Sequence, residues 1–217
     1  MEEVIATSAA ANSDNAHSAG RLFPASIEDC TYTSCYCEEN VWKLCEHVKL
    51  KDPAELNRCY VVFISNKKRQ VPLWHQRASK RPDRLVIWDY HVVLIYLHQD
   101  LGFLVYDLDT ELDFPCPFKS YFAQTIGEEK TLKPEFRRYF RVIRGEEYLR
   151  EFASDRSHMT KEDGGWMSPP PPYPCIQTPT CQNNIQDFIS METTVGFGTV
   201  VSAKALWDMF SGVLKPP

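Results

Sequence analysis

The sequence predicts an α+β fold built around a mainly antiparallel sheet. A helical repeat of apolar residues begins at Cys37, and two expected β-hairpins follow it, over residues 59–74 and 86–109. The order helix, hairpin, hairpin is typical of this fold class. With 217 residues and 43% hydrophobic side chains, the chain is long enough for one well-packed domain. We expect a disordered tail over residues 1–27, a single domain over 28–212 and a short C-terminal tail over 213–217.

Charge and composition exclude several functional classes. The net charge is -5 and the pI about 5.7, and the one basic run, Lys67-Lys68-Arg69, falls where a turn is expected. Nucleic-acid binding normally requires a basic patch, so we expect no nucleic-acid partner. Residues 1–20 lack the basic flank and apolar core of a signal peptide, and no apolar run is long enough for a membrane span. Eight cysteines in such a chain indicate reduced thiols in the cytosol or nucleus.

The first helix is predicted from its apolar stripe. Ser34 is a candidate N-cap, and Glu38 and Glu39 in the opening turns complement the helix dipole. We therefore expect a cysteine in the first turn, on the inward face. The stripe consists of Cys37, Val41, Leu44, Cys45 and Val48.

The run 86–97 is predicted to be one central strand, because it is rich in β-branched and aromatic residues and lacks Gly and Pro. Alternation places Asp89 and His91 on one face of it, together with Ile87. If the following hairpin is centred near Gln99, His91 lies opposite Asp107, with Cβ atoms roughly 4.5 to 5.5 Å apart. A slip of one residue would place the two on opposite faces.

Shorter elements are expected along the rest of the chain. Pro72 marks residues 71–74 as an edge strand, and the strap 169–174, with five prolines, must be extended. The remaining predicted elements are a strand at 59–65, short helices starting at Ser120 and Pro134, a strand at 139–143, a helix at 146–153, a helix at 185–191 capped by Asn184, a strand at 199–201 and a helix at 202–211 closed by Gly212.

Cys37, His91 and Asp107 are the candidate catalytic residues, because a thiol at a helix start, an imidazole and a carboxylate form a thiol-based acyl-transfer site. The helix N-terminus and a neighbouring imidazolium both favour thiolate, so we expect Cys37 to be ionised near neutral pH. His91 then moves protons while Asp107 fixes its tautomer. The order Cys, His, Asp, with the helix first, is similar to papain-like and transglutaminase-like enzymes.

Other interpretations remain open for these residues. A buried thiol is often only a small hydrophobe, Cys35 is a rival nucleophile, and Asp89 is a rival orienting group for the histidine. A zinc site is the competing chemistry, but the crowded residues do not form paired C-x2-C knuckles, and we expect no metal. They are Cys30, Cys35, Cys37, Cys45 and His47.

Several blocks of the sequence closely resemble the protein N-terminal glutamine amidohydrolases, over residues from about Cys30 to Gly198. The blocks are residues 34–45 (SCYCEENVWKLC), 86–93 (VIWDYHVV), 106–110 (YDLDT), 152–159 (FASDRSHM) and 169–176 (PPPPYPCI). The resemblance implies a monomeric enzyme without metal or cofactor, with an α-β-α sandwich related to the transglutaminase core. It also places the family's catalytic residues on Cys37, His91 and Asp107.

The resemblance further implies deamidation of an N-terminal glutamine to glutamate, with release of ammonia through a thioester intermediate. The product would feed the N-degron route of protein degradation in the cytoplasm and nucleus. Asp89 or Asp109 is expected to bind the α-ammonium of the substrate. The alternatives are a transglutaminase-like acyl transferase, a thiol peptidase, or an inactive module that binds N-termini.

Overall fold

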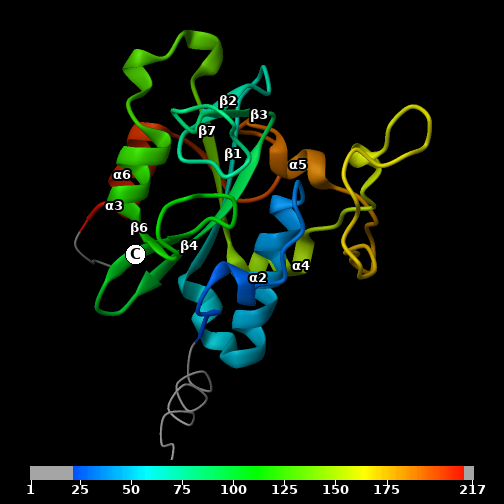
Figure 1. Ribbon diagram of the computed structural model, residues 1–217. Helices are drawn as coiled ribbons and strands as arrows, with labels where there is room; N and C mark the ends of the chain where they lie inside the picture. Colours follow the sequence, from blue (N-terminus) through cyan, green and yellow to red (C-terminus); the bar gives the residue numbers. More distant parts are fainter. Residues whose placement is uncertain (1–21, 213–217) are drawn as a thin grey trace, which may run out of the picture.

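The computed structural model describes residues 22–212, which form a central sheet of six antiparallel strands in the order β6-β5-β4-β1-β7-β8 (Figure 1). This confirms the predicted α+β class with a mainly antiparallel sheet. The strands are β1 (Cys59–Ser65), β4 (His91–His98), β5 (Gly102–Tyr106), β6 (Cys116–Pro117), β7 (Tyr139–Arg144) and β8 (Thr199–Ser202).

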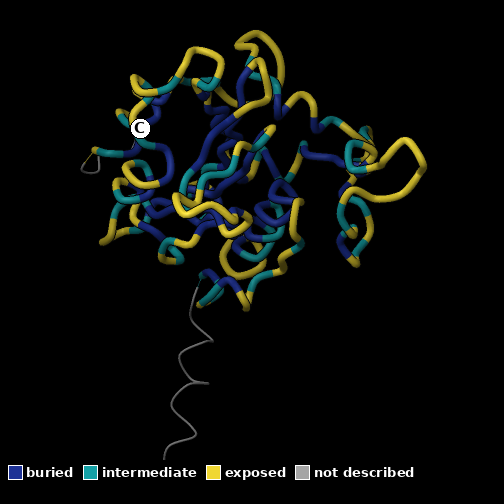
Figure 2. The backbone as a smooth tube through the Cα atoms, turned by 45° about the horizontal axis from the view of Figure 1, so that its top comes forward, coloured by how far each residue is buried: buried dark blue, intermediate teal, exposed yellow. Residues whose placement is uncertain are grey.

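Helices cover both faces of this sheet. On β1, Val61 and Phe63 belong to one apolar cluster, whereas Val62 and Ile64 belong to the other. Because side chains alternate along a strand, the two clusters lie on opposite faces, and the central strands are buried on both sides (Figure 2). One face carries α2 (Cys37–Lys51), α4 (Gly145–Glu151) and α5 (Ile185–Ile189), and the other carries α3 (Phe118–Tyr121) and α6 (Ala203–Phe210).

Short helical turns connect these elements. They are the 3-10 turns η1 (Ile27–Asp29), η2 (Pro53–Arg58), η4 (Glu129–Thr131), η5 (Pro134–Phe136) and η6 (Ser157–Met159), and the π-helical turn η3 (Phe122–Ile126).

The prediction of one central strand over residues 86–97 is wrong. The chain bends at Asp89 and Tyr90, so that β3 (Val86–Trp88) pairs with β2 (Val71–Leu73) in a separate two-stranded sheet, and only β4 enters the main sheet. The bend leaves Asp89 and Ile87 exposed instead of on a core face. It also places His91 at the first position of β4.

The predicted hairpin of residues 59–65 with 71–74 is wrong as well, because β1 pairs with β4 and β7. β1 spans seven residues and pairs along both of its edges, with six residues matched on each side. The three residues of β2 include Pro72, which cannot donate to a ladder, so β2 is an edge strand with β3 as its one partner, as Pro72 had indicated.

The β4–β5 hairpin has a different register from the one predicted. Leu94 faces Tyr106 and His98 faces Gly102, which shifts the pairing by two residues from the expected one. Strand side chains have a period of two, so a two-residue slip keeps every side chain on its expected face. β5 ends at Tyr106, so Asp107 lies one residue beyond the ladder and still on the side of His91.

Helix α2 begins at Cys37, and its predicted apolar stripe is buried as expected. Ser34 is not its N-cap, because Tyr36 occupies that position and makes no side-chain capping bond. Asn40 holds the approach instead: its Oδ1 accepts the Thr33 N–H at 2.8 Å, and its Nδ2 donates to the Thr33 carbonyl at 2.9 Å. These two bonds fix the loop that delivers Cys37 to the first turn.

The later elements follow the predictions closely. β7, β8, α4, α5 and α6 differ from the expected bounds by at most two residues at each end. The helix expected at Ser120 begins at Phe118, and Pro134 starts a 3-10 turn rather than a longer helix.

Both predicted tails lie largely outside the described residues, so the division into tails and one domain stays a prediction. Phe23 already packs on Tyr106, with ring centroids 4.1 Å apart, so the core receives contacts from residues before Ile27. In the described part of the chain, no helix is long and apolar enough to cross a membrane.

Candidate active site

His91 and Asp107 form a buried pair, as the sequence analysis predicted. The Nε2 atom of His91 lies 2.8 Å from Oδ1 of Asp107, and both side chains are at most 1% exposed. Because an ionised carboxylate accepts and cannot donate, Nε2 carries the proton of this bond. In residues 22–212, the other ring nitrogen, Nδ1, has no hydrogen-bond partner and is therefore free to accept a proton.

Three further donors hold the Asp107 carboxylate. The backbone N–H of Asp109 donates to Oδ1 at 2.9 Å, the Tyr121 hydroxyl donates to Oδ2 at 2.8 Å, and Gln76 approaches Oδ2 at 3.5 Å. Gln76 in turn accepts the indole N–H of Trp88 at 3.0 Å. Trp88 stacks on the His91 ring, with centroids 5.3 Å apart. The imidazole is therefore held by stacking on its face and by the Asp107 hydrogen bond at its edge.

The pair shifts the acidity of both groups. Burial works to lower the pKa of His91, but the carboxylate of Asp107 outweighs it, and the pKa lies above its ordinary value. Burial works to raise the pKa of Asp107, but His91 and the donors around the carboxylate hold it below its ordinary value. The raised pKa makes the neutral His91 ring a stronger base, and the lowered pKa keeps Asp107 ionised beside it.

Cys37 is the first residue of α2 and is buried. Its thiol donates to Oε2 of Glu38 at 3.6 Å. Burial raises the pKa of Cys37 well above its ordinary value, and Glu38 and Asp109 raise it further. The expected resting thiolate is therefore wrong, because burial and nearby carboxylates outweigh the helix N-terminus.

A cavity of about 380 Å³ opens beside Cys37. Asp89 and Asp109, the predicted substrate-binding carboxylates, both line it, and so does the rival nucleophile Cys35, which is exposed. Asp109 is 6% exposed, accepts the Tyr32 hydroxyl at 2.6 Å, and has a pKa raised by burial. The remaining lining residues are Arg69, Trp88, Tyr90, His158, Met159, Met167, Ser168, Gln186 and Ile189.

Two residues of this site were missed by sequence reasoning. Glu38, expected only to complement the helix dipole, is fully buried, and His158 lines the cavity with a side chain only 15% exposed. Periodicity gives no signal for either, since one lies at a helix start and the other in a 3-10 turn. The sequence block 152–159, which contains His158, was the available signal.

The donor atoms of His91, Asp107 and Asp109 lie within 4.8 Å of one another, and in residues 22–212 they are the one such group that could hold a metal ion. The His91–Asp107 contact has the length of a direct hydrogen bond. A metal between them would need about 2 Å to each ligand and would displace that proton. The geometry therefore fits a proton-carrying pair.

The crowded cysteines Cys30 to Cys45 do not converge on a metal site, and the cysteines are free thiols.

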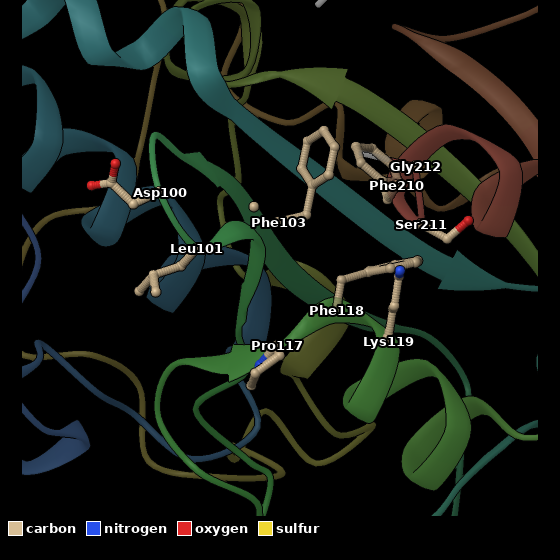
Figure 3. A pocket seen from close by; sticks show the side chains of 10 residues that line it. Asp100, Leu101, Phe103, Pro117, Phe118, Lys119, Phe210, Ser211 and Gly212 are labelled. Atoms are coloured by element: carbon tan, nitrogen blue, oxygen red, sulfur yellow. The ribbon is translucent and has the colours of Figure 1, made fainter. Parts of the chain in front are cut away.

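A second cavity, of about 310 Å³, lies on the other face of the sheet, next to the β4–β5 turn and the end of α6 (Figure 3). Phe103, Phe118 and Phe210 line it, and its charged lining residues are Asp100 and Lys119. It contains none of the candidate catalytic groups. The cavity beside Cys37, in contrast, is lined by the candidate nucleophile and by Asp89 and Asp109.

A buried cysteine at a helix start, a histidine held by an aspartate and an adjoining cavity are the groups that thiol-dependent acyl-transfer enzymes use. Comparison with known proteins gives the family: residues 32–210 match the model of the N-terminal glutamine amidase family, and the chain belongs to it.

Its relatives cover most of the chain. The protein N-terminal glutamine amidohydrolase of Bos taurus is 51% identical over 183 residues, which are 84% of this chain and 87% of the relative. Those of Homo sapiens and Danio rerio are 51% and 49% identical, over 83% and 88% of this chain and 88% and 94% of their own.

Proposed function

We propose that this protein hydrolyses the side-chain amide of a glutamine at the N-terminus of a protein, leaving glutamate and releasing ammonia. The names of its relatives give the substrate, and the family match covers both Cys37 and the His91–Asp107 pair. The observation that carries the chemistry is the His91–Asp107 pair: Nε2 bonds Asp107 at 2.8 Å, and Nδ1 has no hydrogen-bond partner within residues 22–212. Cys37 is buried at the start of α2.

The proposed mechanism uses Cys37, His91 and Asp107 as a triad. His91 takes the thiol proton at Nδ1 as the Cys37 sulfur attacks the amide carbon, and the backbone N–H of Cys37, at the helix start, donates to the oxyanion. The tetrahedral intermediate collapses to a thioester, and His91 returns the proton to the departing ammonia. Water then gives a proton to His91 and attacks the thioester, which yields glutamate and restores the thiol.

The raised pKa of Cys37 bears on the first step. Because the resting thiol is neutral, no thiolate is present before the substrate reacts. The thiol proton is therefore transferred to His91 during the attack on the amide carbon. The strengthened base supports such a transfer.

Substrate binding is assigned to the two carboxylates that line the cavity. Asp89 is exposed at the bend between β3 and β4, and Asp109 lies deeper, beside the histidine pair. Either one can accept hydrogen bonds from the α-ammonium of an N-terminal glutamine. A free α-ammonium exists only at a chain terminus, so such a contact would exclude internal glutamine.

We also propose the wider setting that the family resemblance implies. The core is taken to be papain-like and transglutaminase-like, with the nucleophile at a helix N-terminus, and the catalytic domain to span residues 28–212 of a monomer without metal or cofactor. Free cysteines suit a reducing compartment, the cytosol or nucleus. There the glutamate product would feed the N-degron route of protein degradation.

The test is a matched peptide assay. Purified protein is mixed with peptides that begin with Gln, begin with Asn, or contain Gln internally, and both ammonia release and conversion of amide to acid are measured. Only the first peptide should react, without peptide-bond cleavage or crosslinking. Cys37→Ala should abolish the reaction while Cys35→Ala keeps it. Full activity of Cys37→Ala would refute the assigned nucleophile, and cleavage or crosslinking would favour a peptidase or an acyl transferase.

A further inference from the structure

Glu38 is a buried carboxylate directly beside the proposed nucleophile. It is 0% exposed, and its Oε2 accepts the Cys37 thiol at 3.6 Å and the Tyr90 hydroxyl at 3.0 Å. Its other oxygen, Oε1, has no hydrogen-bond partner in the described part of the chain, and the nearest ring nitrogen of His158 is 3.6 Å away. Cys37, Tyr90 and His158 all line the cavity, and Glu38 contacts each of them from the side away from the cavity.

The neighbouring residue shows how this protein normally accommodates a buried carboxylate. Glu39 is also 0% exposed, but Arg156 binds both of its oxygens at 2.8 Å. A buried charge is costly unless it is paired, and the guanidinium provides that pairing. The two adjacent glutamates are thus equally buried, but an arginine pairs with the carboxylate of Glu39 and none pairs with that of Glu38 in the described residues.

Within residues 22–212, Glu38 has no ion pair with a lysine or arginine. The cation that lines the cavity, Arg69, donates to Gln186 instead. The charges nearest the thiol are mostly negative, since Asp89 and Asp109 line the same cavity. Such a site disfavours a thiolate until a positive charge enters it. The ionisable groups near Cys37 or Glu38 are Asp89, Tyr90, His91, Asp109, Tyr148 and His158, and Arg69 lines the same cavity.

Building on the proposed function, we propose that Glu38 is a positioning residue that restricts the reactivity of Cys37 to substrates with a free α-ammonium. Without substrate, the thiol donates to Glu38 and its proton is retained. The α-nitrogen of glutamine is separated from its amide carbon only by Cα, Cβ and Cγ, so a substrate poised at the sulfur places its ammonium in the same cavity. That charge offsets Glu38 and the lining aspartates, and the thiol can then give its proton to His91.

This arrangement lets the enzyme discriminate twice between terminal and internal glutamine. The aspartates that line the cavity favour the ammonium in binding, and Glu38 makes the same ammonium a condition for nucleophile activation. A nearby charge typically shifts a pKa by about 1–3 units, so the reactivity of the thiol at neutral pH should change roughly tenfold or more. The expected signature is an effect on kcat in addition to KM.

The first test measures the thiol without turnover. Iodoacetamide, a small amide, alkylates Cys37 as its sulfur displaces iodide, and fragmentation mass spectrometry locates the label. At pH 7, triglycine should accelerate alkylation of the wild-type protein, whereas N-acetyl-triglycine should not. Glu38→Gln should be alkylated about tenfold faster or more, with its pH profile shifted to lower pH and a smaller acceleration by triglycine than wild type shows. The matched control is Glu46→Gln, further along α2, where Glu46 pairs with Lys43 at the surface.

The second test uses turnover of peptides that begin with Gln or N-acetyl-Gln. The wild-type protein should have a higher kcat and a lower KM for the peptide with the free amine. Glu38→Gln should reduce the ratio of the two kcat values about tenfold, and Glu46→Gln should leave that ratio unchanged. Triglycine that slows or leaves unchanged the alkylation of wild type would overturn the inference, as would an unshifted profile for Glu38→Gln. The proposed function fails separately, if Gln-initiated peptides release no ammonia, because alkylation does not depend on turnover.

Discussion

Asp107→Asn tests the proposed triad most directly. The substitution keeps the shape of the side chain and removes the charge that faces the His91 ring at 2.8 Å. At this hydrogen-bond length the charge centres of an imidazolium and a carboxylate are about 4 Å apart, and their attraction is about 4 kcal/mol at an effective dielectric constant of 20. Loss of that attraction in the transition state should lower kcat about 10³-fold.

A second effect of the substitution concerns the tautomer. Oδ1 of Asp107 also accepts the backbone N–H of Asp109, and Tyr121 donates to Oδ2. An asparagine has one acceptor oxygen, so if its amide N–H₂ faces the ring, Nε2 must become the acceptor and the ring proton moves to Nδ1. Nδ1 then cannot take the thiol proton, and the loss of kcat exceeds the electrostatic value.

The assay is ammonia release from a Gln-initiated peptide, with thermal unfolding followed by circular dichroism to confirm that the variant is folded. Asp113→Asn is the control, because Asp113 is exposed on the same segment. It should retain wild-type kcat. A folded Asp107→Asn protein with kcat within about tenfold of wild type would refute the argument, since the charge would then contribute little to the transition state.

Three further outcomes are expected. Activity should fall as the pH drops through the pKa of His91, because a protonated ring cannot accept the thiol proton; this pKa lies above its ordinary value. A kcat/KM that does not change between about pH 5 and 8, the range in which a histidine titrates, would contradict this prediction. Arg156→Met should lower the free energy of unfolding by about 3–5 kcal/mol in a denaturant titration, because Glu39 is left buried and unpaired. Arg150→Met, at an exposed ion pair, should leave the free energy of unfolding nearly unchanged. Dialysis against EDTA should leave activity unchanged, and a loss restored by one divalent metal would assign the His91, Asp107 and Asp109 group to an ion.

Local pattern in the sequence determined the period, the buried face and the approximate bounds of most elements. The apolar stripe of α2 placed Cys37 at the helix start and facing inward, and alternation placed His91 and Asp107 on one side of a hairpin. The second of these held although the register was wrong by two residues, because an even slip preserves the face. Side-chain periodicity is a property of neighbouring residues, and it can therefore be read without knowing the fold.

Only the tertiary structure decided which strands pair and how each buried charge is compensated. β1 pairs with β4 and β7 rather than with β2, and the chain turns at Asp89 between two sheets. Arg156 compensates Glu39 from 117 positions along the chain, whereas Glu38 next to it receives no such partner in the described residues. Pairing and charge compensation depend on groups far apart in sequence. Burial, together with the carboxylates of Glu38 and Asp109, raises the pKa of Cys37, whereas helix position and a neighbouring imidazolium had predicted a thiolate.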